Sequence, residues 1–209
     1  MTPATALTTT AGRDVCDRDA LVERFNRVVR RPAEFGGLAE VARLLGRLAV
    51  GDPQGGEQVW IPDTNARLAP SMMFREGFSA PEIHVAASQY GEDAHRRGWL
   101  RLDRTLTAAE HSFVVDNAAS WSETDRSLRE ILAEFGLPSV TFGATDPDLP
   151  KTVSYAGDDR TAPVVAFHLG AAPSGADTGG AAVLLAVRVH DGFFGGGWEI
   201  TPFGESHLD

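Results

Sequence analysis

The stretch that decides the fold is Ser122–Gly143, SETDRSLREILAEFGLPSVTFG. Its first half carries apolar residues at helical spacing, and they form a single stripe: Leu128, Ile131, Leu132 and Phe135. We expect Ser122 to be the N-cap of this helix, with Asp125 in the first turn as its reciprocal capping partner. Gly136 and Pro138 then end the helix, because glycine accepts a positive φ and proline cannot continue a helix.

After Pro138 the apolar period changes from helical to twofold, which is typical of strands. The pattern predicts five of them, at 139–142, 152–155, 164–169, 182–190 and 198–201. The connections are short and rich in Gly, Pro and Asp, and they leave no room for a helix. We therefore expect an antiparallel meander in chain order. One face of this sheet should be apolar and should pack on the helix stripe, through Val140, Phe142, Val165, Phe167, Leu185, Val187 and Ile200.

Four helices are predicted before this switch, at 17–31, 38–50, 79–97 and 107–118. The fold class is therefore α+β, with helices in the N-terminal two thirds, then a four- to five-stranded antiparallel meander with helices on one face. Residues 1–16 are expected to form a flexible tail and 17–50 a helical pair. The glycine-rich segment 51–56 separates this pair from an α+β body at 57–209.

The chain is acidic, with 29 acidic and 19 basic residues and a net charge of −10. Residues 1–50 carry eight basic and six acidic groups, so residues 51–209 hold a net charge of −12. Such a body repels nucleic acid and anionic membranes. We expect neither as a partner, and a basic protein instead.

The composition favours a soluble cytoplasmic protein, because no apolar run approaches the ~20 residues of a membrane helix. The N-terminus does not read as a signal peptide, and the single cysteine, Cys16, excludes an internal disulfide. One lysine against 18 arginines is typical of a GC-rich bacterial genome.

The familiar catalytic signatures are missing, which favours a protein that is not an enzyme. The sequence has no G-x-x-x-x-G-K-[ST], G-x-S-x-G, H-E-x-x-H or C-x-x-C motif. No set of ligands has metal-binding spacing, so we expect neither a metal nor a cofactor.

Strand alternation nonetheless gathers titratable groups on the second sheet face. If the strands pair in order, this face holds His168, Arg188, His190 and Glu199 as candidate catalytic groups, because two imidazoles and a carboxylate can serve acid and base chemistry. Thr141 and Thr201 would lie beside them as binding residues. The alternative is an ordinary solvent-facing polar side of a sheet.

Phe193 and Phe194 are a further binding candidate, because two adjacent aromatic residues in a glycine-rich turn are difficult to bury together. Two functional classes follow from the sequence. The first is an acidic binding protein, for example an immunity-type inhibitor of a basic toxin. The second is a small-molecule-binding protein or enzyme that uses the face with His168, His190 and Glu199.

Overall fold

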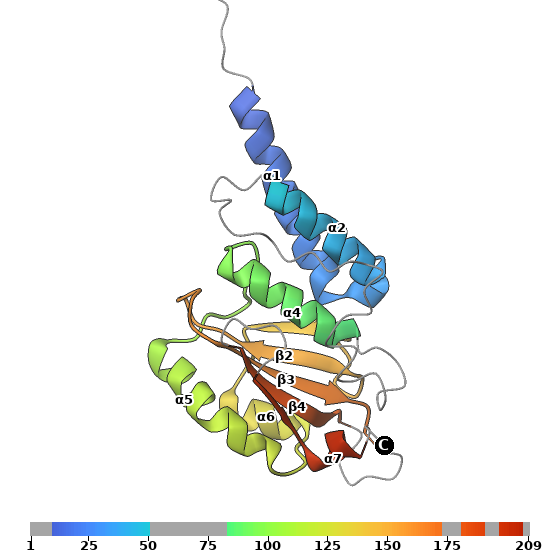
Figure 1. Cartoon of the computed structure of the whole chain (residues 1–209), viewed down its shortest axis with the longest axis vertical. Coiled ribbons are helices and arrows are strands. Elements are labelled where there is room, and N and C mark those ends of the chain that lie inside the picture. Colours follow the sequence, from blue (N-terminus) through green and yellow to red (C-terminus); the bar gives the residue numbers. More distant parts are fainter. Residues whose placement is uncertain (1–9, 51–82, 173–180, 191–196, 207–209) are drawn as a thin grey trace, which may run out of the picture.

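The chain folds around a five-stranded antiparallel sheet in the order β1-β2-β3-β4-β5 (Figure 1). The computed structural model describes residues 10–50, 83–172, 181–190 and 197–206. The strands are β1 (Val140–Gly143), β2 (Lys151–Tyr155), β3 (Val164–Gly170), β4 (Val183–His190) and β5 (Trp198–Ile200). The predicted α+β class and the meander are therefore confirmed, with strand ends displaced by at most one residue.

The helices before the sheet follow the predicted apolar stripes. They are α1 (Thr10–Arg30), the short η1 (Pro32–Glu34), α2 (Gly37–Val50), α4 (Ile83–Arg96), α5 (Ala108–Ala118), η2 (Ala119–Ser122) and α6 (Leu128–Phe135). A one-turn helix, α7 (Pro202–Glu205), follows β5. The first helix begins inside the stretch 1–16 that the sequence assigned to a tail. Within the described residues, no helix is long and apolar enough to cross a membrane.

The helix of the deciding stretch begins later than predicted. Ser127, not Ser122, is the N-cap of α6, and its hydroxyl accepts a hydrogen bond from Glu130 N in a full capping box. Ser122 instead lies at the end of η2, where its hydroxyl donates to Ala119 O. Asp125 does not take part in capping α6. Its carboxylate accepts a hydrogen bond from Phe203 N and so connects α7 with the segment before α6.

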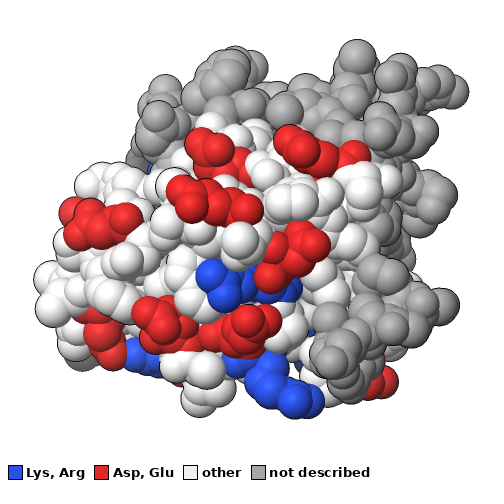
Figure 2. Space-filling model, turned by 90° about the horizontal axis from the view of Figure 1, so that it is seen from below, with Lys and Arg blue, Asp and Glu red and all other residues white. Residues whose placement is uncertain are grey.

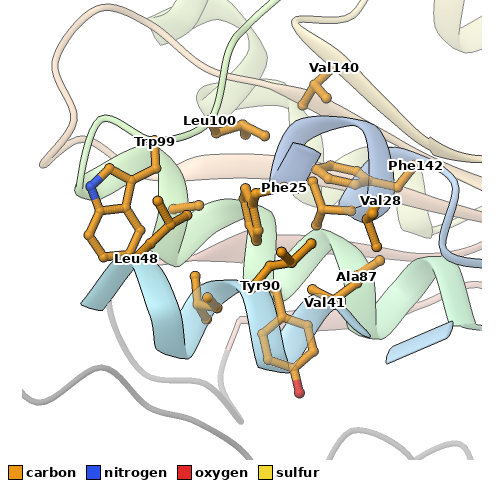
Figure 3. Close-up of a cluster of buried hydrophobic side chains, with 14 residues drawn as sticks. Phe25, Val28, Val41, Leu48, Ala87, Tyr90, Trp99, Leu100, Val140 and Phe142 are labelled. Carbon is orange, nitrogen blue, oxygen red and sulfur yellow. The ribbon is translucent and has the colours of Figure 1, made fainter. Parts of the chain in front are cut away.

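Helices cover both faces of the sheet, so the prediction of helices on one face is not confirmed (Figure 1). On one face, α5 and α6 pack on β2, β3 and β4 around Phe135, Val153 and Phe167. On the other face lies α4, with the α1–α2 hairpin beyond it. The hairpin and α4 enclose a second core around Phe25, Leu48 and Tyr90 (Figure 3).

The register explains which strand residues meet which helices. Val140 pairs with Ser154, and Phe142 pairs with Thr152, so both apolar residues of β1 face α4 and join the second core. The prediction that they pack on α6 is therefore wrong, whereas Val165, Phe167 and Val187 do share a cluster with Leu128, Ile131 and Phe135.

A register shift between β3 and β4 changes the face of one predicted core residue. His168 pairs with Ala186 and Leu169 with Leu184, so Leu185 is the extra residue of a bulge. Leu185 consequently packs with Val85 and Phe203 on the α4 side, away from α6. Strict alternation along β4 cannot predict this, because the shift inverts the pattern midway through the strand.

Candidate functional site

The structure brings together only part of the polar face that the sequence predicts. Arg188 pairs with Ala166 on β3, and Ala166 and His168 are two residues apart, so Arg188 and His168 share the face covered by α4. Glu199 pairs with Val187, and Thr141 with Val153, so both belong to the α6 face. The predicted grouping of Glu199 and Thr141 with His168 is therefore wrong.

Thr201 has a local structural task. Its hydroxyl donates to Leu184 O at 2.7 Å and accepts from Gly204 N at 3.0 Å, which caps α7. The backbone of His190 closes β4 opposite Val164. The side chain of His190, and both Phe193 and Phe194, lie outside the described residues.

Arg188 forms a buried ion pair with a residue that the sequence analysis did not single out, Glu92 of α4. The guanidinium Nη1 lies 2.9 and 2.8 Å from the two carboxylate oxygens, and both side chains are at most 3% exposed. Arg188 also lies over the ring of Trp198 at 5.3 Å. The pair holds α4 against β4, and its burial keeps it away from any substrate in solution.

His168 belongs to a hydrogen-bonded chain that links α4 to the sheet. His84 Nδ1 lies 2.8 Å from Thr152 Oγ1, which in turn lies 2.8 Å from His168 Nδ1. The His168 ring stacks on Trp198 with a centroid distance of 4.9 Å. Complete burial lowers the pKa of His168 well below its ordinary value, and nearby His84 and Arg188 lower it further.

The single proton of the Thr152 hydroxyl couples the two imidazoles. Because the hydroxyl can donate to only one Nδ1, at least one of His84 and His168 carries its proton on Nδ1 when both are neutral. His168 Nε2 is buried without a partner in the described part of the chain. An unpaired lone pair is less costly there than an unpaired N–H, which favours His168 with its proton on Nδ1.

A recess of about 320 Å³ opens beside His84. Three separate segments line it: η1 with the preceding Arg31, the start of α4, and the β1–β2 hairpin. Its surface is mainly apolar, with contributions from Pro32, Ile83, Leu149 and Pro150. Recesses of this size and character accommodate small organic molecules. Within the described residues, no three acidic, His or Cys side chains gather to hold a metal ion.

The opposite side of the molecule presents an acidic surface. We use the name acidic face for the exposed surface of α5, η2 and α6. Residues 105–140, which include these elements, hold six acidic and two basic side chains. Figure 2 views the molecule from this side and shows acidic groups across much of it, with fewer basic groups between them.

Sequence reasoning missed both α4 partners of the predicted site. A usable signal was present, because His84, Ser88 and Glu92 recur every four residues and so follow one side of a helix. All three are buried. A polar stripe on a helix next to a polar strand face indicates that the two surfaces pair with each other.

Comparisons with protein-family models, with curated proteins and with solved structures find no match to this chain.

Proposed function

We propose that this protein is an acidic binding protein whose partner is a basic protein, for example a toxin that it inhibits. The observation that carries the proposal is the acidic surface of α5, η2 and α6, in a chain whose residues 51–209 have a net charge of −12. Long-range attraction between opposite charges accelerates encounter and disfavours acidic competitors.

The burial of the candidate catalytic groups supports a binding role over an enzymatic one. His168 and Arg188 are both 0% exposed beneath α4, and Glu199 belongs to the opposite face of the sheet. A substrate would have to displace α4 and break the Glu92–Arg188 pair to reach them. These residues therefore fit a structural role at the contact between α4 and the sheet.

The test is affinity capture from the native host, followed by reconstitution with the purified candidate. The proposal expects a basic protein that binds directly and, if it is a toxin, loses its activity when this protein is added. An acidic or neutral partner would contradict the proposal. The acidic residues of α5 and α6 can then be neutralised. If the partner still binds equally well, the charge of this surface does not contribute to binding.

A second candidate function is small-molecule binding at the recess beside His84. The observation that favours it is the volume of about 320 Å³ within a mainly apolar lining of three chain segments. Native mass spectrometry of protein purified from its host would then show a co-purifying metabolite. Ala144→Trp, which fills the recess from the β1–β2 side, should abolish this species, and retention of the metabolite in that variant would contradict the assignment.

A further inference from the structure

An aromatic cluster extends from the core to the surface between α5 and α6. The rings of Phe113 and Phe135 have centroids 5.9 Å apart, and the ring of Trp121 lies 4.9 Å from Phe135. Phe135 also lies 5.2 Å from Phe167 of β3, deep in the core. Phe113 is nevertheless 44% exposed, so this cluster has one edge in solvent.

Leu137, directly after α6, adds a second exposed apolar side chain at 70% exposure. Arg104 connects it with α5, because the guanidinium donates to Leu137 O at 2.9 Å and also pairs with Glu110. Glu110 lies one helical turn before Phe113 and therefore on the same side of α5. Phe113 and Leu137 thus flank one apolar spot on the acidic face.

Exposed carboxylates lie on α5, on α6 and between the two helices. Asp116, Glu123 and Glu134 are exposed, and none of them forms an ion pair within the described residues. The nearby Arg126 is already engaged, since it lies 3.5 Å from Glu130 and 5.0 Å over the ring of Trp121. Arg129 of α6 is also exposed, but three carboxylates outnumber it, so the surface offers net unpaired negative charge beside the apolar spot.

We infer that the acidic face docks a basic segment of the partner protein, which places an apolar side chain between Phe113 and Leu137. Protein interfaces concentrate binding energy in a few central apolar or aromatic residues within a polar rim. Charge complementarity selects a rim of lysines and arginines on the partner. The inference rests on the proposed function and adds the location and chemical form of the contact.

A defined probe tests the surface without knowledge of the natural partner. The probe is a synthetic amphipathic helix with one leucine face and one lysine face, and its glutamate-for-lysine counterpart is the control peptide. Amide NMR shifts should change in α5, η2 and α6 on addition of the lysine peptide only. Shift changes centred on α1 and α2, or equal binding of the glutamate peptide, would overturn the inference.

Matched variants separate the apolar centre from general charge. The double variant Phe113→Ala, Leu137→Ala should weaken binding of the lysine peptide by about tenfold or more, as expected for loss of a hot spot. Glu134→Lys should weaken it as well. Val50→Ala, at a 92% exposed position on α2, and Glu34→Lys in η1 are controls that should change affinity less than twofold.

The failure of this inference and the failure of the proposed function can be distinguished with the natural partner. A basic partner that binds the Phe113, Leu137 double variant as tightly as the unaltered protein would leave the proposed function intact and exclude this surface. Failure to recover any basic partner would contradict the proposed function itself. Circular dichroism of each variant confirms that its fold is retained, which assigns the loss of binding to the surface.

Discussion

At the scale of single residues, the buried Glu92–Arg188 ion pair holds α4 against the sheet. Removing a carboxylate from a buried pair leaves a desolvated guanidinium, which costs more than the pair contributes. We therefore expect Glu92→Gln to lower the free energy of unfolding by about 3–5 kcal/mol. The double variant Glu92→Met, Arg188→Met should lose much less. Denaturant titration measures both, and a Glu92→Gln loss below about 1 kcal/mol would match an exposed pair instead.

His168 makes stability depend on pH at the scale of a single residue. Burial lowers its pKa in the folded protein, whereas the ring titrates near pH 6.5 in the unfolded chain. Below that pH the unfolded chain gains a proton that the folded chain does not, so stability falls by up to about 1.4 kcal/mol per pH unit. His168→Gln should reduce this slope between pH 6.5 and 5, as measured by unfolding in urea. Equal slopes in both proteins would show that His168 is not held neutral.

At the scale of elements, close packing of α4 on β1 explains why Gly91 stands in the middle of a helix. A Cβ at this position would lie 2.6 Å from Cε1 of the buried Phe142 ring, so only glycine lets the helix approach β1 so closely. In an isolated helix, alanine is more favourable than glycine by about 1 kcal/mol. We expect Gly91→Ala to destabilise the protein by about 1–3 kcal/mol in spite of this, through overpacking. Adding Phe142→Leu should recover part of the loss, and a net gain from Gly91→Ala alone would refute the close contact.

The elements themselves could be predicted because their signals are local. The capping box of Thr107 and Glu110, the stripe of α6 and the turn residues of the meander each act within a few residues of the chain. Most of the candidate site could not be predicted, because it depends on register and layer order. The bulge at Leu185 and the partnership of Glu92 with Arg188 join residues that no local pattern connects. The polar stripe of α4, formed by His84, Ser88 and Glu92, was the one local pattern that indicated a contact between α4 and the polar strand face.

At the scale of the whole molecule, the helices on the two faces of the sheet differ in where their carboxylates lie, because Glu92 of α4 is buried whereas Glu130 of α6 is exposed. On the α4 side, the ion pair at the contact with the sheet is buried, with Glu92 and Arg188 at most 3% exposed. On the α5–α6 side, the side chains of Glu110 and Glu130 are about half exposed. Hydrogen bonds from Thr107 and Ser127 hold the pKa of Glu110 and of Glu130 below its usual range, so both remain charged at neutral pH.

The last prediction follows from this exposed charge and concerns the rate of association. A body with a net charge of −12 over residues 51–209 attracts a basic partner over distances set by salt. The screening length falls from about 30 Å at 0.01 M to about 10 Å at 0.1 M ionic strength. The on-rate of the partner should therefore fall markedly over this range while the off-rate changes less, because contacts at close range are screened weakly. Stopped-flow measurements at the two salt concentrations decide this. Substituting Asp116, Glu123 and Glu134 with their amides should weaken the salt dependence of the on-rate. An on-rate that does not change with salt in the unaltered protein would exclude electrostatic steering by this surface.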